Sequence, residues 1–198
     1  MNGYEDKYLR EKVNRIIARQ KEGKIIRTYL KPSSERGRLF DPCAGEGKAA
    51  STLGNALNCE SWGVELSPER AEKAKNVMDK VFLVPWKACV LSDESISWLY
   101  LNPPYDFDRF EGHPTQNSGA SKRLEWDFLK TTTSKLMRGG LLTYIIPQKI
   151  LGMIEVARLL AGHYEAITVY RFPDGLYEKF KQVVVLAYKR KLYRLPMD

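Results

Sequence analysis

Apolar residues recur along this chain with two different periods that replace one another. Short apolar runs alternate with stretches in which apolar residues return every three or four positions. The short runs, expected to be strands, are residues 38–41, 61–66, 81–84, 97–101, 141–146, 166–172 and 183–188. The longer stretches, expected to be helices, are residues 48–57, 68–80, 122–137 and 149–161. Alternating strands and helices predict an α/β fold with a mostly parallel sheet.

The last two predicted strands, 166–172 and 183–188, are connected differently from the others. The segment between them shows no clear helical pattern and is too short for a helical crossover. Parallel neighbours need such a crossover, whereas antiparallel neighbours can be joined by a loop. We therefore expect these two strands to pair antiparallel.

The N-terminal segment, residues 1–37, has its own pattern. Apolar residues follow helical spacing at Leu9, Val13, Ile16 and Ile17, and a second short helical stretch reaches Pro32. Residues 1–38 hold eleven Lys and Arg against five Asp and Glu, so 11 − 5 = +6 of the charge lies there. We expect a basic helical segment packed on the core formed by residues 38–198, within a single domain.

The charge balance bears on the partner. The formal net charge is +8 and the pI is near 9.3. An uneven basic surface suggests a polyanionic partner, and nucleic acid comes first, although a merely solubilising basic surface fits as well. No apolar run approaches the length that crosses a bilayer, and the polar N-terminus does not resemble a secretory signal. A cytoplasmic location without membrane association is the resulting expectation.

Cysteine and histidine usage argues against a metal site. The three cysteines, Cys43, Cys59 and Cys89, match no zinc spacing, and the histidines His113 and His163 lie far apart in the sequence. We expect reduced, partly buried thiols and no bound metal.

A glycine turn follows the first predicted strand, with the sequence Asp41-Pro-Cys-Ala-Gly-Glu-Gly47. Glycines let a backbone approach a ligand closely, and the start of the next helix offers free N–H groups. Glu65 closes the second predicted strand, where an acid can bind ribose hydroxyls. This combination predicts a site for a nucleotide-type cofactor.

Two cofactors compete for the glycine turn. Gly45, Gly47 and Ala50 fit the dinucleotide fingerprint, and Glu65 stands at the matching distance, which favours NAD. The carboxylate of Asp41, however, would repel a pyrophosphate. S-adenosylmethionine carries an ammonium and a sulfonium, which the same carboxylate would attract.

The fourth predicted strand ends at Asn102-Pro103-Pro104-Tyr105. A conjugated amine is a poor nucleophile because its lone pair is delocalised. The Asn102 side-chain oxygen and a backbone carbonyl can each accept one of its hydrogens, and proline keeps that carbonyl aimed. Tyr105 offers a flat face for a planar substrate. The tetrapeptide therefore predicts catalysis by positioning and hydrogen bonding.

The turn at 41–47 and the motif at 102–105 together carry a resemblance. The chain resembles class I S-adenosylmethionine-dependent methyltransferases with an (Asn/Asp/Ser)-Pro-Pro-(Tyr/Phe/Trp) motif, over about residues 38–190. It is most similar to N6-adenine DNA methylases and related small bacterial proteins. This resemblance implies a Rossmann-like sheet of seven mostly parallel strands, the last antiparallel, with helices on both faces. It also implies methyl transfer from S-adenosylmethionine, with DNA as the favoured partner.

The resemblance further assigns roles to individual residues. Asp41 and the 43–47 backbone would hold the methionine part of the cofactor, and Glu65 its ribose. Asn102 and the Pro103 carbonyl would hold the target amine, and an aromatic residue between the last two strands would sandwich it. The expected site residues are Asp41, Cys43, Ala44, Gly45, Gly47, Glu65, Leu66 and Asn102 for the cofactor, Asn102, Pro103 and Tyr105 for catalysis, and Pro104, Tyr105, Phe172 and Tyr177 for the substrate.

The sequence also departs from the family pattern. Lys87 stands where many members carry an acid that contacts the cofactor's adenine, so Trp86, Leu66 or a backbone group would replace that contact. The family's aromatic-Thr-Pro segment and a target recognition domain are missing. Sequence specificity would then need a partner, a homo-oligomer or recognition of shape.

Four functions remain open from the sequence. The leading one is adenine N6 methylation in DNA. The second keeps the enzyme class but acts on an RNA base or a protein glutamine amide. The third is a non-catalytic partner subunit that binds nucleic acid, and the fourth is an NAD enzyme, which Asp41 and Asn102 disfavour.

Overall fold

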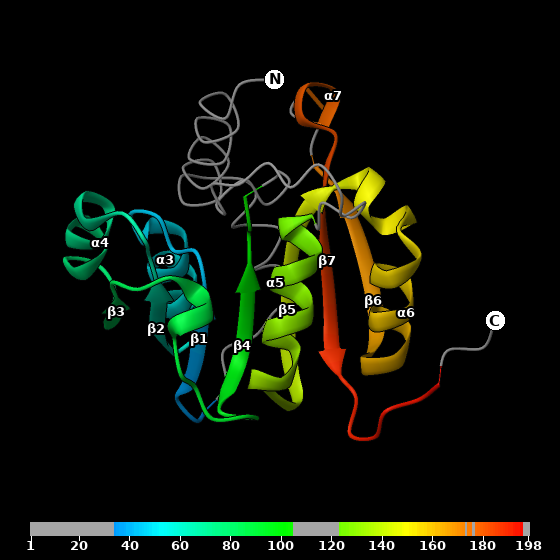
Figure 1. Cartoon of the computed structure of the whole chain (residues 1–198), viewed down its shortest axis with the longest axis horizontal. Helices are drawn as coiled ribbons and strands as arrows, with labels where there is room; N and C mark the ends of the chain where they lie inside the picture. Colours follow the sequence, from blue (N-terminus) through cyan, green and yellow to red (C-terminus); the bar gives the residue numbers. More distant parts are fainter. Residues whose placement is uncertain (1–33, 105–122, 173, 176, 196–198) are drawn as a thin grey trace, which may run out of the picture.

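Seven strands form one sheet in the order β3-β2-β1-β4-β5-β7-β6 (Figure 1). Strand β7 runs antiparallel to β5 and β6, and the remaining hydrogen-bonded pairs are parallel. The predicted α/β class and the antiparallel final pair are thus confirmed. This computed structural model describes residues 34–104, 123–172, 174–175 and 177–195. The strands are β1 Gly37–Asp41, β2 Cys59–Val64, β3 Lys80–Phe82, β4 Ile96–Leu101, β5 Leu136–Pro147, β6 Tyr164–Arg171 and β7 Gln182–Lys189.

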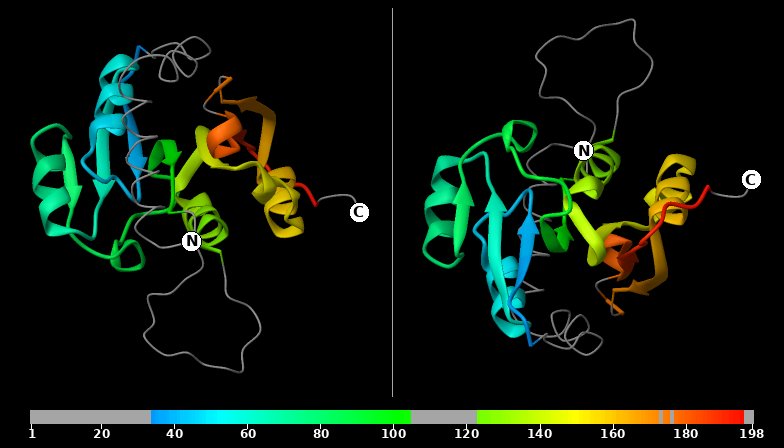
Figure 2. Two further views of the ribbon diagram at one scale, coloured as in Figure 1. Left: turned by 90° about the horizontal axis from the view of Figure 1, so that it is seen from above. Right: turned by 90° about the horizontal axis from the view of Figure 1, so that it is seen from below.

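Helices cover both faces of the sheet, as predicted (Figure 2). Helix α3 packs on one face, and α5 and α6 pack on the other. Helix α4 lies beside β3, at the outer end of the sheet. The helices are α3 Lys48–Ala56, α4 Pro68–Lys75, α5 Leu124–Thr132, α6 Ile154–His163 and the single turn α7 Tyr177–Phe180, with 3-10 turns η1 Trp86–Ala88, η2 Thr133–Lys135 and η3 Gln148–Gly152.

Alternation along each strand divides the core between the two faces. In β1, Leu39 joins the cluster beneath α3 and Phe40 joins the cluster beneath α5 and α6, and both are fully buried. Tyr100 and Leu101 of β4 divide in the same way. Burying such a side chain stabilises the fold by roughly 1.5–3 kcal/mol. Strands β1 and β4 are therefore held firmly in the core, which also restricts the position of the residues that directly follow them.

The largest difference from the predicted elements lies around Gly139. The pattern predicts a helix to residue 137 and a strand from 141, but α5 ends at Thr132 and β5 already begins at Leu136. Gly139 has φ +75°, and the pairing of β5 with β4 shifts register beside it. The glycine pair therefore sits at an irregularity inside the strand and does not start it.

Other boundaries differ more modestly. Strand β2 is Cys59–Val64 and not the predicted 61–66, so Glu65 follows this strand, which it was expected to close. Helix α4 ends at Lys75, five residues before the predicted 80. The predicted helix 149–161 is divided into η3 and α6. The connection between β6 and β7 contains the single turn α7, where no helix was expected.

His163, the last residue of α6, couples stability to pH. Its ring packs on the Tyr193 ring at 4.7 Å between centroids. Burial, aided by the charge of Lys189, lowers the pKa of His163 below its usual 6.5. The folded state therefore favours the neutral ring. The contribution of His163 to the free energy of unfolding is fully present above about pH 6.5 and is lost as the pH falls below that value.

We expect His163→Phe to reduce the loss of stability between pH 7 and pH 5. Phenylalanine retains a ring beside Tyr193 and removes the titration. The measurement is the free energy of unfolding in urea across this pH range for both proteins. Parallel curves for the two proteins would show that His163 does not contribute to the pH dependence.

The remaining expectations on thiols, metals and membranes concern the described part of the chain. All three cysteines are free thiols there, with Cys43 buried. No cluster of three or more potential metal ligands occurs among those residues. None of their helices combines the length and hydropathy needed to span a bilayer.

Candidate active site

The glycine turn and the Asn-Pro-Pro motif follow neighbouring parallel strands, β1 and β4. Strand order reverses between these two strands, since β2 and β3 lie on one side and β5 on the other. In open α/β sheets, ligands bind outside the carboxyl ends of the strands at such a point. The topology therefore brings both predicted constellations to the expected binding edge.

Asp41 anchors the glycine turn from the end of β1. Its side chain is 1% exposed, and Oδ1 accepts a hydrogen bond of 2.9 Å from the Cys43 N–H. Gly45 and Gly47 both have positive φ, 62° and 77°, which glycine adopts without strain. A buried carboxylate at the start of this turn can attract a cation.

Helix α3 begins directly after this turn. Gly47 is its N-cap residue, so no side chain caps the helix. The first N–H groups of a helix lack intrahelical partners and attract anions. The turn therefore presents the Asp41 carboxylate and a helix N-terminus together, which suits a ligand that carries both an ammonium and a carboxylate.

Glu65 links the turn to helix α4. Its side chain is 3% exposed, and Oε2 accepts a hydrogen bond of 2.8 Å from the Gly45 N–H. Oε1 accepts hydrogen bonds from the Ser67 N–H at 2.8 Å and from Arg70 Nε and Nη2 at 3.1 and 2.5 Å. Glu65, the residue predicted to bind the cofactor's ribose, is therefore held in place by these hydrogen bonds.

Asn102 lies against the turn. Its side chain is 1% exposed, and its backbone carbonyl accepts a hydrogen bond of 3.5 Å from the Cys43 thiol. Pro103 is buried and Pro104 is half-buried. This contact joins residues that are 59 positions apart and brings the two motifs into one site. Tyr105, the fourth residue of the motif, lies outside the described residues.

The two aromatic candidates near β7 differ in accessibility. Phe172 is 2% exposed and belongs to the core cluster beneath α3. Tyr177 is half-buried, and Arg171 and Lys181 lie over its ring at 4.9 and 5.0 Å. Its hydroxyl donates to Gln148 Oε1. Of the two, Tyr177 presents more surface to a substrate, while Phe172 packs as a core residue.

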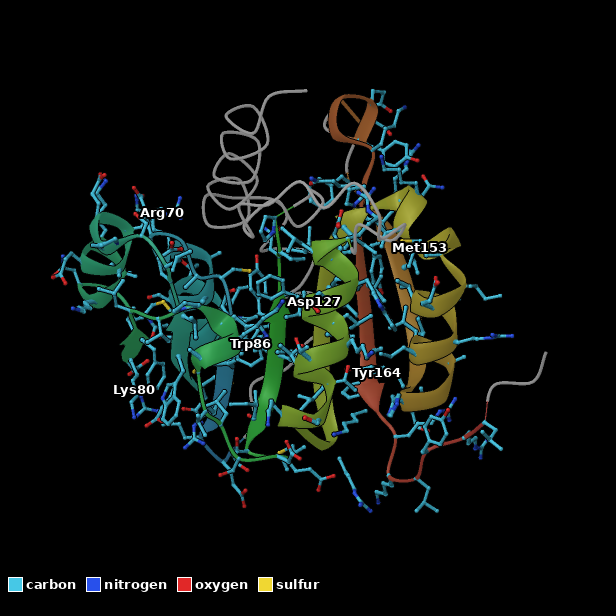
Figure 3. All side chains as sticks on the ribbon, viewed as in Figure 1. Arg70, Lys80, Trp86, Asp127, Met153 and Tyr164 are labelled. Atoms are coloured by element: carbon cyan, nitrogen blue, oxygen red, sulfur yellow. The ribbon has the colours of Figure 1, made fainter. Side chains whose placement is uncertain are left out.

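The residues considered for contact with the cofactor's adenine differ in how far other side chains already engage them. Trp86 packs on Phe40 at 5.6 Å between ring centroids, and its Nε1 donates to Thr131 Oγ1 at 2.9 Å (Figure 3). Lys87 forms an ion pair of 3.5 Å with Asp127 of α5. Leu66, next to Glu65, is 53% exposed. Leu66 therefore offers an apolar surface at the site, whereas Trp86 is engaged between the sheet and α5.

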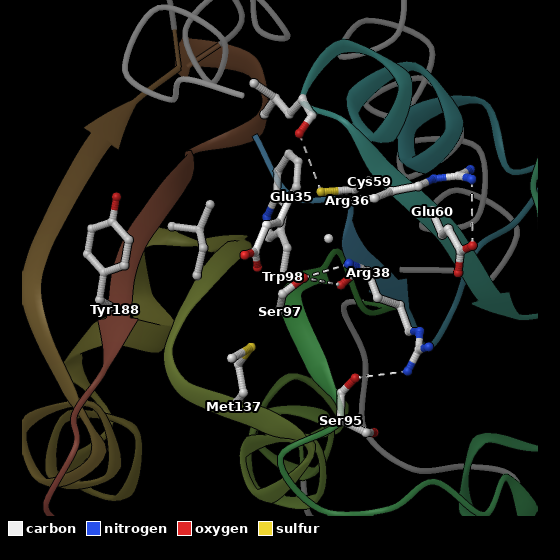
Figure 4. A pocket seen from close by; sticks show the side chains of 13 residues that line it. Glu35, Arg36, Arg38, Cys59, Glu60, Ser95, Ser97, Trp98, Met137 and Tyr188 are labelled. Atoms are coloured by element: carbon white, nitrogen blue, oxygen red, sulfur yellow. Dashed lines mark hydrogen bonds and ion pairs between the residues drawn. The ribbon is translucent and has the colours of Figure 1, made fainter. Parts of the chain in front are cut away.

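A separate cavity of about 690 Å³ opens at the opposite edge of the sheet (Figure 4). Its lining comes from residues at or near the amino ends of β1, β2, β4 and β5 and from the carboxyl end of β7, including Cys59, Trp98, Met137, Leu141 and Tyr188. None of the predicted site residues lines it. It is therefore distinct from the edge that carries the glycine turn.

Sequence reasoning missed Arg70. A cation in the first turn of a helix opposes the helix dipole, so it is unfavourable there without a nearby acid. Its position, five residues after Glu65, is the signal that would have suggested it.

Comparisons with known proteins concern the family and the fold of this chain. The sequence profile of the Uncharacterised methyltransferase family (DUF6094) matches residues 18–198. No protein of curated function matches the sequence.

Three solved structures show the same fold. A Listeria monocytogenes protein described as a class I S-adenosylmethionine-dependent methyltransferase has a TM-score of 0.64 at 14% identity, covering 95% of this chain and 62% of its own. The tRNA (m1A58) methyltransferase TrmI from Aquifex aeolicus scores 0.52 at 16%, covering 78% and 63%. The type IIG restriction endonuclease BpuSI scores 0.58 at 18%, covering 98% and 26%.

The chain thus spans less than two thirds of the length of each of these three proteins. At such identities the likeness concerns the fold alone. The profile match, by contrast, covers most of the sequence, and the chain therefore belongs to the Uncharacterised methyltransferase family.

Proposed function

We propose that this protein transfers a methyl group from S-adenosylmethionine to an amino nitrogen, and that the acceptor is adenine N6 in DNA. The observation that carries the proposal is the contact of the Cys43 thiol with the Asn102 carbonyl, at 3.5 Å. This contact sets the predicted cofactor turn directly against the predicted catalytic motif. The family supports methyl transfer, and the nature of the acceptor is the proposal.

The residues at the binding edge fit S-adenosylmethionine, which supplies an electrophilic methyl group when it is bound. Asp41 would hold the ammonium, and the N-terminus of α3 would hold the carboxylate. Glu65 would accept hydrogen bonds from the ribose, and Leu66 would pack on the adenine ring. A pyrophosphate cofactor would instead bring negative charge next to the Asp41 carboxylate, which disfavours it.

The motif would orient the acceptor. Asn102 Oδ1 and the Pro103 carbonyl would each accept one hydrogen of the amine, which localises the nitrogen lone pair. Tyr105 and Tyr177 would stack on the flat acceptor. Catalysis then consists of alignment and hydrogen bonding without a covalent nucleophile.

Nucleic acid is the acceptor class that the charge favours. The chain carries a formal net charge of +8. BpuSI is a DNA restriction enzyme and TrmI acts on tRNA, so proteins with this fold include some that act on either nucleic acid. DNA remains our proposal, and an RNA base or a protein glutamine amide is an alternative outcome of the test below.

The cofactor is tested by isothermal titration calorimetry with S-adenosylhomocysteine and with NADH. We expect heat of binding for S-adenosylhomocysteine only. Binding of NADH alone would overturn the proposal, since the glycine turn would then serve a dinucleotide.

The acceptor is tested by tritium transfer from labelled S-adenosylmethionine to DNA, RNA and protein. We expect label in DNA. After digestion to nucleosides, the label should be found in N6-methyl-2′-deoxyadenosine. Label confined to RNA or to protein would reassign the acceptor and keep the methyltransferase.

A further inference from the structure

Arg70 is the third residue of helix α4, after the N-cap Ser67 and after Pro68 and Glu69. The positive end of the helix dipole lies there, so an arginine is unfavourable at this position unless an anion compensates it. The guanidinium is mostly buried, since the side chain is 19% exposed, and it pairs with the Glu65 carboxylate. The ion pair of Arg70 with Glu65 is therefore not an ordinary exposed pair of surface charges.

Glu65 divides its two oxygens between different tasks. Oε1 receives three donors, the Ser67 N–H and the Nε and Nη2 groups of Arg70. Oε2 receives the N–H of Gly45, in the middle of the glycine turn. Arg70 thus binds the same oxygen as Ser67, the N-cap of α4, and the other oxygen contacts the glycine turn.

Arg70 also compensates the charge of an almost fully buried carboxylate. Glu65 is 3% exposed, and an ionised carboxylate at such depth needs a paired cation. On the same helix, Lys73 pairs with Glu69 at 2.9 Å, whereas Arg70 is the cation that pairs with Glu65.

We infer that Arg70 is a positioning residue that holds Glu65 in the orientation in which it binds the two ribose hydroxyls of the cofactor. This inference rests on the proposed function. Arg70 itself does not touch the ligand. A carboxylate that Arg70 and Gly45 already hold in place loses little side-chain freedom on binding, which lowers the entropic cost of its hydrogen bonds with the hydroxyls.

The experiment compares two ligands on each protein by calorimetry. The ligands are S-adenosylhomocysteine and its 2′,3′-dideoxy analogue, which differ only in the ribose hydroxyls. Each hydrogen bond to a charged group is worth roughly tenfold or more in affinity, so the wild type should prefer the hydroxylated ligand by about a hundredfold. In Arg70→Met we expect this preference to fall to about tenfold or less.

Two variants serve as controls. Lys75→Met changes an exposed cation of the same helix that pairs with Glu72, and it should retain the full preference. Arg70→Lys restores a positive charge without the guanidinium fork, and it should recover part of the preference. Circular dichroism of each variant checks that the fold is intact.

The ratio separates positioning from a structural role. If Arg70 only stabilised α4, its loss would weaken both ligands equally and leave the ratio near a hundredfold, which would overturn the inference. If the wild type does not bind S-adenosylhomocysteine, the proposed cofactor itself fails. If the wild type binds both ligands equally, Glu65 does not recognise the ribose and the inference fails while the cofactor stands. If Arg70→Met is unfolded, Arg70→Lys gives the decisive ratio, and an unchanged ratio there contradicts positioning by the guanidinium.

Discussion

Asn102→Ala should lower the rate constant of methyl transfer by about a hundred- to a thousandfold, the cost of removing one aligned hydrogen-bonding group from an active site. The side chain is almost fully buried and follows the rigid strand β4, so its carboxamide occupies a fixed position. Alanine removes the acceptor oxygen without adding bulk. The affinity for S-adenosylhomocysteine should change by only a few-fold, because Asp41 and the turn remain.

The measurement is single-turnover tritium transfer to the best acceptor of the DNA, RNA and protein panel, together with calorimetry. Asn102→Asp retains an acceptor oxygen and should keep more activity than alanine does. Asn76 is an exposed asparagine at the end of α4. Asn76→Ala is therefore the matched control and should leave the rate unchanged. Normal turnover in Asn102→Ala would remove this residue from the mechanism.

Glu65→Gln should weaken S-adenosylhomocysteine binding by about a hundredfold and also destabilise the fold. The glutamine has no charge to pair with Arg70, so a mostly buried guanidinium loses its counterion. Breaking a buried ion pair by changing one partner typically costs about 3–5 kcal/mol, here reduced by the partial exposure of Arg70. The amide also offers one acceptor oxygen where Glu65 offers two, and the donors on the two oxygens come from different segments.

Calorimetry and urea unfolding at pH 7 measure the two effects. Glu60→Gln is the control, because Glu60 lies 3.7 Å from Arg36 in an exposed pair that should contribute less than about 1 kcal/mol. If Glu65→Gln matches the wild type in both measurements, the carboxylate is needed neither for the ribose nor for the turn.

The double variant Glu65→Gln with Arg70→Met tests whether the two residues act together. Neighbours in one network are non-additive, so the double variant should be less destabilised than the sum of the single changes. Additive effects would mean that the two residues stabilise the protein independently.

Much of the site was accessible from the sequence because its residues follow strands. Asp41, Glu65 and Asn102 come at or directly after the ends of strands β1, β2 and β4, whose apolar runs predict them. The carboxyl ends of parallel strands lie at one edge of a sheet, so the positions in the sequence predict that these groups gather there. Glycines in the turn mark a backbone that needs positive φ, and Gly45 and Gly47 adopt it.

The boundaries around β5 were less accessible. Gly139 and Gly140 locally indicate the end of a helix, because glycine pairs mark turns and glycine is a common helix C-cap. The strand instead continues through them, because Leu136, which precedes the glycines, already pairs with Ile96 of β4, while pairing with β7 begins at Leu141. Tertiary pairing here outweighs local propensity.

Local patterns were enough to predict the α/β class, the antiparallel final pair and the residues at the carboxyl edge of the sheet, because periodicity and strand-end positions are local properties. These patterns did not predict which of those residues meet. The Cys43 thiol reaches the Asn102 carbonyl, and Arg70 binds Glu65. Phe172 packs into the core, and the half-buried Trp86 packs against it. These outcomes depend on the order of the strands and on which face a side chain occupies, and contacts between distant segments set both.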